Sequence, residues 1–204
     1  MNPIELLQQH CTFSNPYEVY VLFGISRKKY NDCTGGQEKL FREIIKHPDD
    51  IVKKYTRLKN SILAYRDEKN ERRTFYMYVS VNPRDTRKAF LQLQREFVTI
   101  NQELMNQVDV TNQLNSIDKR YMSCLMQPES RSGRGKFLID IDYKDYRKDN
   151  IALCLATKTK ILLLQETKNG FHILTEPFNR EELSCNDYEI KTDSLLFVEW
   201  FDKQ

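Results

Sequence analysis

Two aspartates stand two residues apart at the end of an apolar run, Phe137-Leu138-Ile139-Asp140-Ile141-Asp142. In a β-strand their side chains project from the same face, with the Cα atoms about 7 Å apart. Two carboxylates at that separation repel each other unless solvent or a divalent cation neutralises them. Hard oxygen ligands favour Mg²⁺ or Mn²⁺, so the pair predicts a metal site. The alternative is a strand end with two solvated aspartates.

A histidine follows the second candidate feature, the turn Lys168-Asn169-Gly170. Asn-Gly between apolar runs is a strong hairpin signal and leads into a strand over 171–175. His172 lies close to this chain reversal, where it can contact a phosphate or a reacting group. Lys168 can supply positive charge to the same anion. The alternative for His172 is a hydrogen-bonded core histidine.

The third candidate feature is the apolar segment 194–201 near the end of the chain, with the acids Asp193 and Glu199. Glu199 sits inside this predicted strand, where an unpaired carboxylate is costly. Asp193 precedes it and also suits a plain turn residue. The two acids lie about 20 Å apart along an extended strand, so they cannot both serve one metal cluster.

A basic helix start is the fourth candidate feature. Asn82 and Pro83 have the residue types of an N-cap and a first helical position, which predicts a helix through about residue 104. Helix N-termini and basic side chains suit phosphate binding, although basic residues on an amphipathic helix also form solvated faces. The basic residues near this helix start and before the preceding strand are Arg72, Arg73, Arg84, Arg87 and Lys88.

The apolar periodicity predicts the elements that position these residues. In the first half it predicts helices at 4–11, 37–47, 51–65 and 82–104 and strands at 18–23 and 74–81. After a polar loop at 128–135 it predicts strands at 137–142, 161–165, 171–175 and 194–201, with short helices at 146–156 and 177–183. Strands mixed with short helices indicate an α+β fold. We expect an N-terminal α/β module over 1–127 and a second module over 136–204, together one compact core.

The composition sets outer limits on the class of protein. The 204 residues are 40% hydrophobic and 30% charged, which favours a folded globular chain over a disordered one. No apolar run approaches the roughly 20 residues that cross a bilayer, and the N-terminus does not resemble a secretion signal. Five irregularly spaced cysteines indicate free thiols in a reducing compartment. We therefore expect a cytoplasmic protein that is neither secreted nor associated with a membrane.

The motifs FLIDID, KNGFHIL and LFVEW resemble, in this order, those of the archaeo-eukaryotic primase and primase-polymerase superfamily. That superfamily has a strand with an aspartate pair, a small residue and a histidine after a turn, and a later strand with a third acid. The resemblance covers about residues 136–200. Many members carry a basic residue directly before the glycine, where this chain has Asn169, with Lys168 one place earlier.

The resemblance implies an antiparallel module like an RNA-recognition fold, packed on the N-terminal module, with the active site between them. Asp140, Asp142 and a third acid (Glu199, or Asp193 in its place) would hold Mg²⁺ or Mn²⁺. His172 and Lys168 would contact a nucleoside triphosphate, and Arg84, Arg87 and Lys88 a nucleic-acid template or primer. The implied activity is nucleotidyl transfer in DNA or RNA synthesis, with a helicase or other replication partner supplied in trans.

Two other functions suit the same residues. A module of this fold without synthesis could bind single-stranded nucleic acid, with Tyr76 and Tyr78 as exposed stacking surfaces. A metal-dependent nuclease also uses acid pairs and a histidine. The patterns for nucleotide loops, zinc proteases and serine hydrolases are absent from the sequence.

Overall fold

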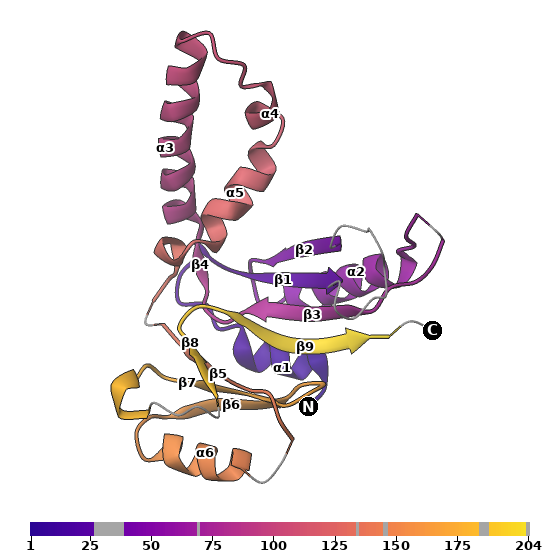
Figure 1. Ribbon diagram of the computed structural model, residues 1–204, viewed down its shortest axis with the longest axis vertical. Helices are drawn as coiled ribbons and strands as arrows, with labels where there is room; N and C mark the ends of the chain where they lie inside the picture. Colours follow the sequence, from indigo (N-terminus) through magenta and orange to yellow (C-terminus); the bar gives the residue numbers. More distant parts are fainter. Residues whose placement is uncertain (27–38, 69, 134, 145–146, 184–187, 203–204) are drawn as a thin grey trace.

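The chain folds into two antiparallel sheets, one above the other, with a long helical arm rising from the first (Figure 1). The computed structural model describes residues 1–26, 39–68, 70–133, 135–144, 147–183 and 188–202. The prediction of an α+β fold is confirmed. Within the described residues, no helix combines the length and the apolar character that a membrane crossing requires.

The first sheet has the strand order β2-β1-β3-β9, and the short strand β4 pairs with one end of β1. These strands are β1 (Glu18–Ser26), β2 (Lys39–Ile45), β3 (Phe75–Ser80), β4 (Arg84–Asp85) and β9 (Leu195–Phe201). Helices α1 (Pro3–His10) and α2 (Asp50–Ala64) pack apolar side chains against one face of this sheet. Part of the other face packs against the base of the helical arm.

The arm consists of α3 (Thr86–Met105), α4 (Thr111–Leu114) and α5 (Ile117–Met126), followed by the 3-10 turn η2 (Pro128–Ser130). Helix α3 leads away from the sheets and α5 returns toward them (Figure 1). Ala89, Leu93 and Leu125 are buried at its base with strand β1. The arm therefore stands on the first sheet, away from the second.

The second sheet has the strand order β6-β7-β5-β8. Its elements along the chain are β5 (Phe137–Ile141), α6 (Arg147–Ala156), β6 (Ile161–Glu166), β7 (Phe171–Thr175), the 3-10 turn η3 (Arg180–Leu183) and β8 (Glu189–Lys191). Ile139, Ile141 and Ile173 pack against α6 on one face. Leu138 and Leu174, on the other face, join the core that the two sheets share.

Three sequence predictions about local structure are wrong. Residues 39–45 form β2 and not a helix, because this segment pairs with β1 along its whole length and alternates in exposure. Helix α3 begins at Thr86 with Asp85 as its N-cap, whereas the side chain of Asn82 binds the backbone of Lys136. Strand β9 pairs with β3, so the last strand of the predicted second module belongs to the first sheet.

Candidate functional site

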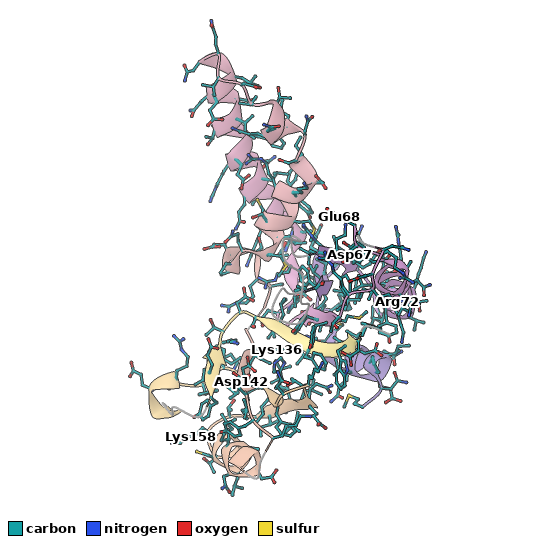
Figure 2. All side chains as sticks on the ribbon, turned by 45° about the vertical axis from the view of Figure 1, so that its right-hand side comes forward. Asp67, Glu68, Arg72, Lys136, Asp142 and Lys158 are labelled. Carbon is teal, nitrogen blue, oxygen red and sulfur yellow. The ribbon has the colours of Figure 1, made fainter. Side chains whose placement is uncertain are left out.

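A pocket of about 240 Å³ lies between the two sheets and brings together residues that the sequence singled out separately. Asp140 and Asp142 reach it from β5, His172 from β7, and Lys168 from the turn between β6 and β7. The other residues that line it are Tyr76, Tyr78, Thr167, Asn169, Glu189, Lys191 and Phe197. Figure 2 labels Asp142 on the second sheet, on the side that faces the first.

Gly170 allows the β6–β7 turn to approach the end of β5. A Cβ atom at this position would lie 1.8 Å from the carbonyl oxygen of Ile141 and 2.9 Å from the backbone nitrogen of Tyr143. The turn is closed by Thr167, whose backbone N–H donates to the Gly170 carbonyl and whose hydroxyl accepts from the Gly170 N–H. Only glycine leaves room for this contact, which places Lys168 and Asn169 beside the aspartates.

Asp140 already has two polar partners, Lys191 and His172. Lys191 Nζ lies 2.6 Å from its Oδ2, and His172 Nε2 lies 3.3 Å from its Oδ1. Burial alone would raise the pKa of this carboxyl, but the hydrogen bonds and charges of His172 and Lys191 outweigh it and lower the pKa to about 2. Lys191 also contacts Glu189 at 3.0 Å, and the two carboxylates outweigh the effect of burial and raise the pKa of this lysine.

His172 connects the two sheets. Its Nδ1 accepts a hydrogen bond of 3.2 Å from the backbone N–H of Phe197 in β9. In the neutral ring the proton therefore resides on Nε2, which is directed at Asp140. Its side chain is only 9% exposed. The histidine thus orients Asp140 against β9, and both of its ring nitrogens are engaged.

Asp142 and Lys168 are two further charged residues of the pocket. Asp142 is exposed, and among the described residues it forms no ion pair. Lys168 Nζ lies 3.2 Å from Asp202 Oδ1, and this hydrogen bond raises the pKa of the lysine. A ligand in the pocket can therefore reach both side chains without displacing a buried group.

Glu199 does not line the pocket, contrary to its expected place as the third acid. Tyr55 donates a hydrogen bond of 2.6 Å to its Oε2, and Lys59 Nζ lies 3.5 Å from its Oε1, both from α2. Burial and the neighbouring Glu199 carboxylate together raise the pKa of the Tyr55 hydroxyl. A shift in the register of β3 and β9 pairs Tyr78 with Phe197 but Met77 with Glu199. This irregularity places Glu199 on the α2 face, although strict alternation would put it with Phe197.

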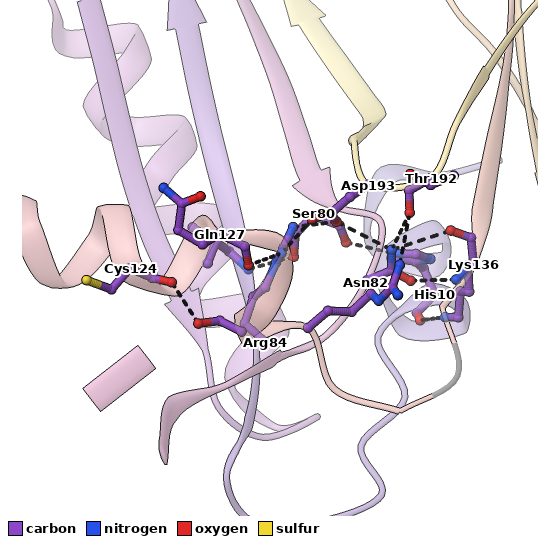
Figure 3. Close-up of polar contacts among 12 residues, drawn as sticks. His10, Ser80, Asn82, Arg84, Cys124, Gln127, Lys136, Thr192 and Asp193 are labelled. Carbon is purple, nitrogen blue, oxygen red and sulfur yellow. Dashed lines mark hydrogen bonds and ion pairs between the residues drawn. The ribbon is translucent and has the colours of Figure 1, made fainter. Parts of the chain in front are cut away.

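Asp193 and Arg84 form a buried ion pair at the junction of the sheets (Figure 3). The two guanidinium NH groups of Arg84 lie 2.8 and 2.7 Å from the two carboxylate oxygens of Asp193. Arg84 is 1% exposed and also donates to the Gln127 carbonyl. Asp193 and Arg84 thus engage each other at the junction and do not line the pocket, so the structure does not bring them to Asp140 and Asp142 as expected for a metal ligand and a nucleic-acid contact.

The other two basic candidates lie at the base of the arm and not in the pocket. Arg87 forms an ion pair of 2.9 Å with Asp85 and stacks on the ring of Tyr17. Lys88 Nζ donates to the Arg131 carbonyl. The expected stacking surface at Tyr76 is also wrong, because that side chain is 3% exposed.

Sequence reasoning missed Lys191 and Glu189, which contribute a cation and a carboxylate to the pocket. Their signal is a three-residue alternation, Glu189-Ile190-Lys191, in which Ile190 packs against the α6 face. Register then places Glu189 opposite Asp140 on β5. Such a short strand gives little periodicity to detect.

The pocket offers few protein ligands for a metal ion. Within the described part of the chain, no group of three or more His, Cys, Asp or Glu side chains is arranged to hold a metal ion. Asp140 and Asp142 alone match the usual protein contribution to Mg²⁺, which is one or two carboxylates completed by water and substrate phosphates. Binding there would require Asp140 to exchange Lys191 for the cation.

A comparison of this chain with protein-family models, with curated proteins and with solved structures finds no match.

Proposed function

We propose that the pocket between the sheets is the active site of a metal-dependent nucleotidyltransferase of primase-polymerase type. The observation that carries this proposal is the meeting of Asp140, Asp142, Lys168 and His172 in one pocket. They come from two separate segments of the chain, which carry the motifs FLIDID and KNGFHIL. The substrates proposed are nucleoside triphosphates and a nucleic-acid strand.

The topology of the second sheet supports the likeness to an RNA-recognition fold. Its elements follow the order strand, helix, strand, strand, 3-10 turn, strand, with strand order β6-β7-β5-β8. A four-stranded antiparallel sheet built in this way matches the ferredoxin-like arrangement, with η3 in place of the second helix. Asp140 and His172 lie on the face opposite α6, which turns toward the first sheet.

The proposed roles follow from the contacts of each residue. Asp140 and Asp142 would hold Mg²⁺ or Mn²⁺, which when bound supplies charge stabilisation for phosphoryl transfer. His172 fixes the orientation of Asp140 through its hydrogen bond from Phe197. Lys168 is close enough to the aspartates to pair with a phosphate once it leaves Asp202.

The test is nucleotide incorporation by the purified chain on primed and unprimed templates, with labelled NTPs or dNTPs and Mg²⁺ or Mn²⁺. Asp140→Asn and Asp142→Asn should abolish product, whereas Asp149→Asn, at an exposed position on α6, should leave it unchanged. Extension that persists in both pocket variants would overturn the proposal. Metal-dependent shortening of a labelled primer without extension would indicate a nuclease instead.

A second candidate function, a non-catalytic module that binds single-stranded nucleic acid, is favoured by one specific observation. Both expected third acids are engaged elsewhere, and the charge of Asp140 is balanced within the protein. This function predicts strand binding without product and without dependence on a divalent cation. Binding that is unchanged in Asp140→Asn, in a chain that forms no product, would select it over the enzyme.

A further inference from the structure

A second pocket, of about 280 Å³, lies at the end of β9, next to the pocket between the sheets. It is lined by Ile62 and Leu63 of α2, by Arg72 and Arg73 before β3, and by Trp200, Phe201 and Asp202. None of these residues belongs to the set that the proposed active site uses. The pocket combines an indole ring with two guanidinium groups, which is the chemistry that recognises a nucleobase and its phosphate.

Trp200 is the only tryptophan of the chain, and it is 41% exposed. One side of its ring is stacked on Phe197, with the ring centroids 5.8 Å apart and an interplanar angle of 23°. Phe197 itself is 3% exposed, so the stack holds the indole in place from beneath. A flat aromatic surface that is both fixed and accessible is a stacking platform for a planar ligand.

Arg72 supplies the unbalanced positive charge of this pocket. Arg73 is paired with Asp67 at 3.3 Å, and Asp202 with Lys168 at 3.2 Å. Arg72 is exposed, and among the described residues no ion pair neutralises it. Arg72 and Asp67, both labelled in Figure 2, lie in the segment that joins α2 to β3. The pocket thus has a net positive charge beside the indole, which complements a phosphate group.

Two contacts join the second pocket to the first. Phe197 lines the pocket between the sheets, and its stacking partner Trp200 lines the second pocket. Lys168 lines the first and Asp202 the second, and these two side chains form an ion pair. A ligand that extends beyond the pocket between the sheets along these contacts therefore approaches Trp200.

We propose that Trp200 stacks on one base of a single-stranded nucleic acid and that Arg72 contacts the phosphate next to that base. The inference deepens the proposed function, on which it rests, by giving the strand a binding site outside the metal-binding aspartates. The stack with Phe197 fixes the platform, and the Lys168–Asp202 pair marks the path toward the first pocket.

The single tryptophan makes a direct test available, because a base stacked on the indole quenches its fluorescence. Titration with a short oligothymidylate should quench the selectively excited emission of Trp200. Arg72→Ala should weaken this binding about fivefold and lower the dependence of log K on log salt concentration by about one. Arg95→Ala, which removes an exposed arginine on the distant arm, should change neither quantity.

A second measurement uses a fluorescently labelled oligonucleotide and its anisotropy. Trp200→Ala should weaken binding about tenfold, within the range of one lost base–aromatic stack. Unchanged affinity in this variant, or no quenching of the native chain at saturating oligonucleotide, would overturn the proposal. Equal quenching by thymidine monophosphate, at the same nucleotide concentration, would show a mononucleotide site and overturn the assignment to a strand.

The Asp140→Asn variant separates this inference from the proposed function. It should lose nucleotide incorporation and keep the quenching of Trp200, because neither Trp200 nor Arg72 contacts Asp140 in the described structure. Incorporation that depends on Asp140 without any quenching refutes the Trp200 site alone. Quenching without incorporation refutes the enzymatic proposal and supports the site as a binding surface.

Discussion

Two aspartates of this protein each face a cation from another segment, yet their surroundings differ. Asp193 and Arg84 are 13% and 2% exposed at the side chain, and the arginine spans both carboxylate oxygens. Asp140 and Lys191 are 22% and 29% exposed and line a pocket. Asp193 is fully used by its partner, whereas Asp140 has Asp142 and Lys168 nearby with capacity for a further ligand.

This difference separates a structural acid from a candidate functional one. Asp140 lies within an apolar strand and Asp193 just before one, so the residue type and the apolar context do not distinguish them. The Arg84–Asp193 pair joins β4 to the segment before β9, and Asn82 completes the junction by binding Asp193 and the Thr192 carbonyl (Figure 3). Breaking the Arg84–Asp193 pair should therefore lower the stability of the fold, whereas breaking the Lys191–Asp140 pair should alter ligand binding in the pocket.

The largest expected effect is at the junction of the sheets. Asp193→Ala leaves the Arg84 guanidinium buried without its anion, which should lower the free energy of unfolding by about 3–5 kcal/mol. Urea unfolding followed by circular dichroism measures it. Lys144→Ala, which breaks an exposed pair with Glu166, should cost no more than about 1 kcal/mol. Equal losses in the two variants would contradict the structural role given to Asp193.

A smaller loss is expected from the glycine that shapes the pocket. Gly170→Ala places a methyl group against the Ile141 carbonyl and should destabilise the chain by roughly 3 kcal/mol, since backbone must move. Gly133→Ala is the matched control: its φ is +65° but its surroundings are open, so only the backbone strain of about 1 kcal/mol applies. A Gly170 variant no less stable than the control would show that the turn does not need this close approach.

The next effect is a pH dependence that belongs to Asp140. Its pKa of about 2 in the folded chain lies below its ordinary value of 3.8. The contacts of the ionised carboxylate with His172 and Lys191 therefore stabilise the fold above about pH 4. That stabilisation, about 2 kcal/mol, is lost as the pH falls from about 4 to 2. Unfolding free energies of native and Asp140→Asn chains should therefore converge over this range.

A second group, His10, titrates in a similar pH range, so the native chain must be compared with the Asp140→Asn variant. His10 is buried, and burial with the charge of Lys136 lowers its pKa from 6.5 to about 3. Its contribution to stability is present above pH 6.5 and is lost as the pH falls toward 3, in the native chain and the variant alike. A difference between them that stays constant from pH 5 to 2 would show that Asp140 is not stabilised by its partners.

The sequence predicted those features that depend on local pattern. The strand of Asp140, the hairpin before His172 and the long helices α2 and α3 follow from periodicity and turn residues. The position of Glu199 did not, because the register irregularity in β9 arises from its pairing with β3 and reverses the expected face. The helix predicted over 37–47 is wrong for a similar reason: the pairing of residues 39–45 with β1 overrides spacing that also fits a helix.

The ion-pair partners of Asp140 and Asp193 could not be predicted from the local sequence pattern either. Lys191 reaches Asp140 from a strand 51 residues further along the chain, and Arg84 reaches Asp193 across 109 residues. Nothing in the spacing around any of these residues encodes such contacts. The sequence thus located Asp140 and Asp142 as candidates but could not show that Asp193 and Glu199 were already engaged.

The smallest expected effect is on the affinity of the Asp140 pocket for a divalent cation. Lys191 contacts one oxygen of Asp140, the carboxylate proposed to hold a divalent cation, so the lysine and the cation compete for this group. Lys191→Met removes the competitor, keeps the length of the side chain, and should raise the affinity for Mn²⁺ about tenfold, or about 1.4 kcal/mol. The electron paramagnetic resonance signal of free Mn²⁺ measures this binding without any assay of activity. Lys160→Met, at an exposed position before β6, should leave the affinity unchanged. Weaker binding in Lys191→Met would mean that the lysine assists the cation, and the pocket would then resemble the saturated junction at Asp193 more closely than a metal site.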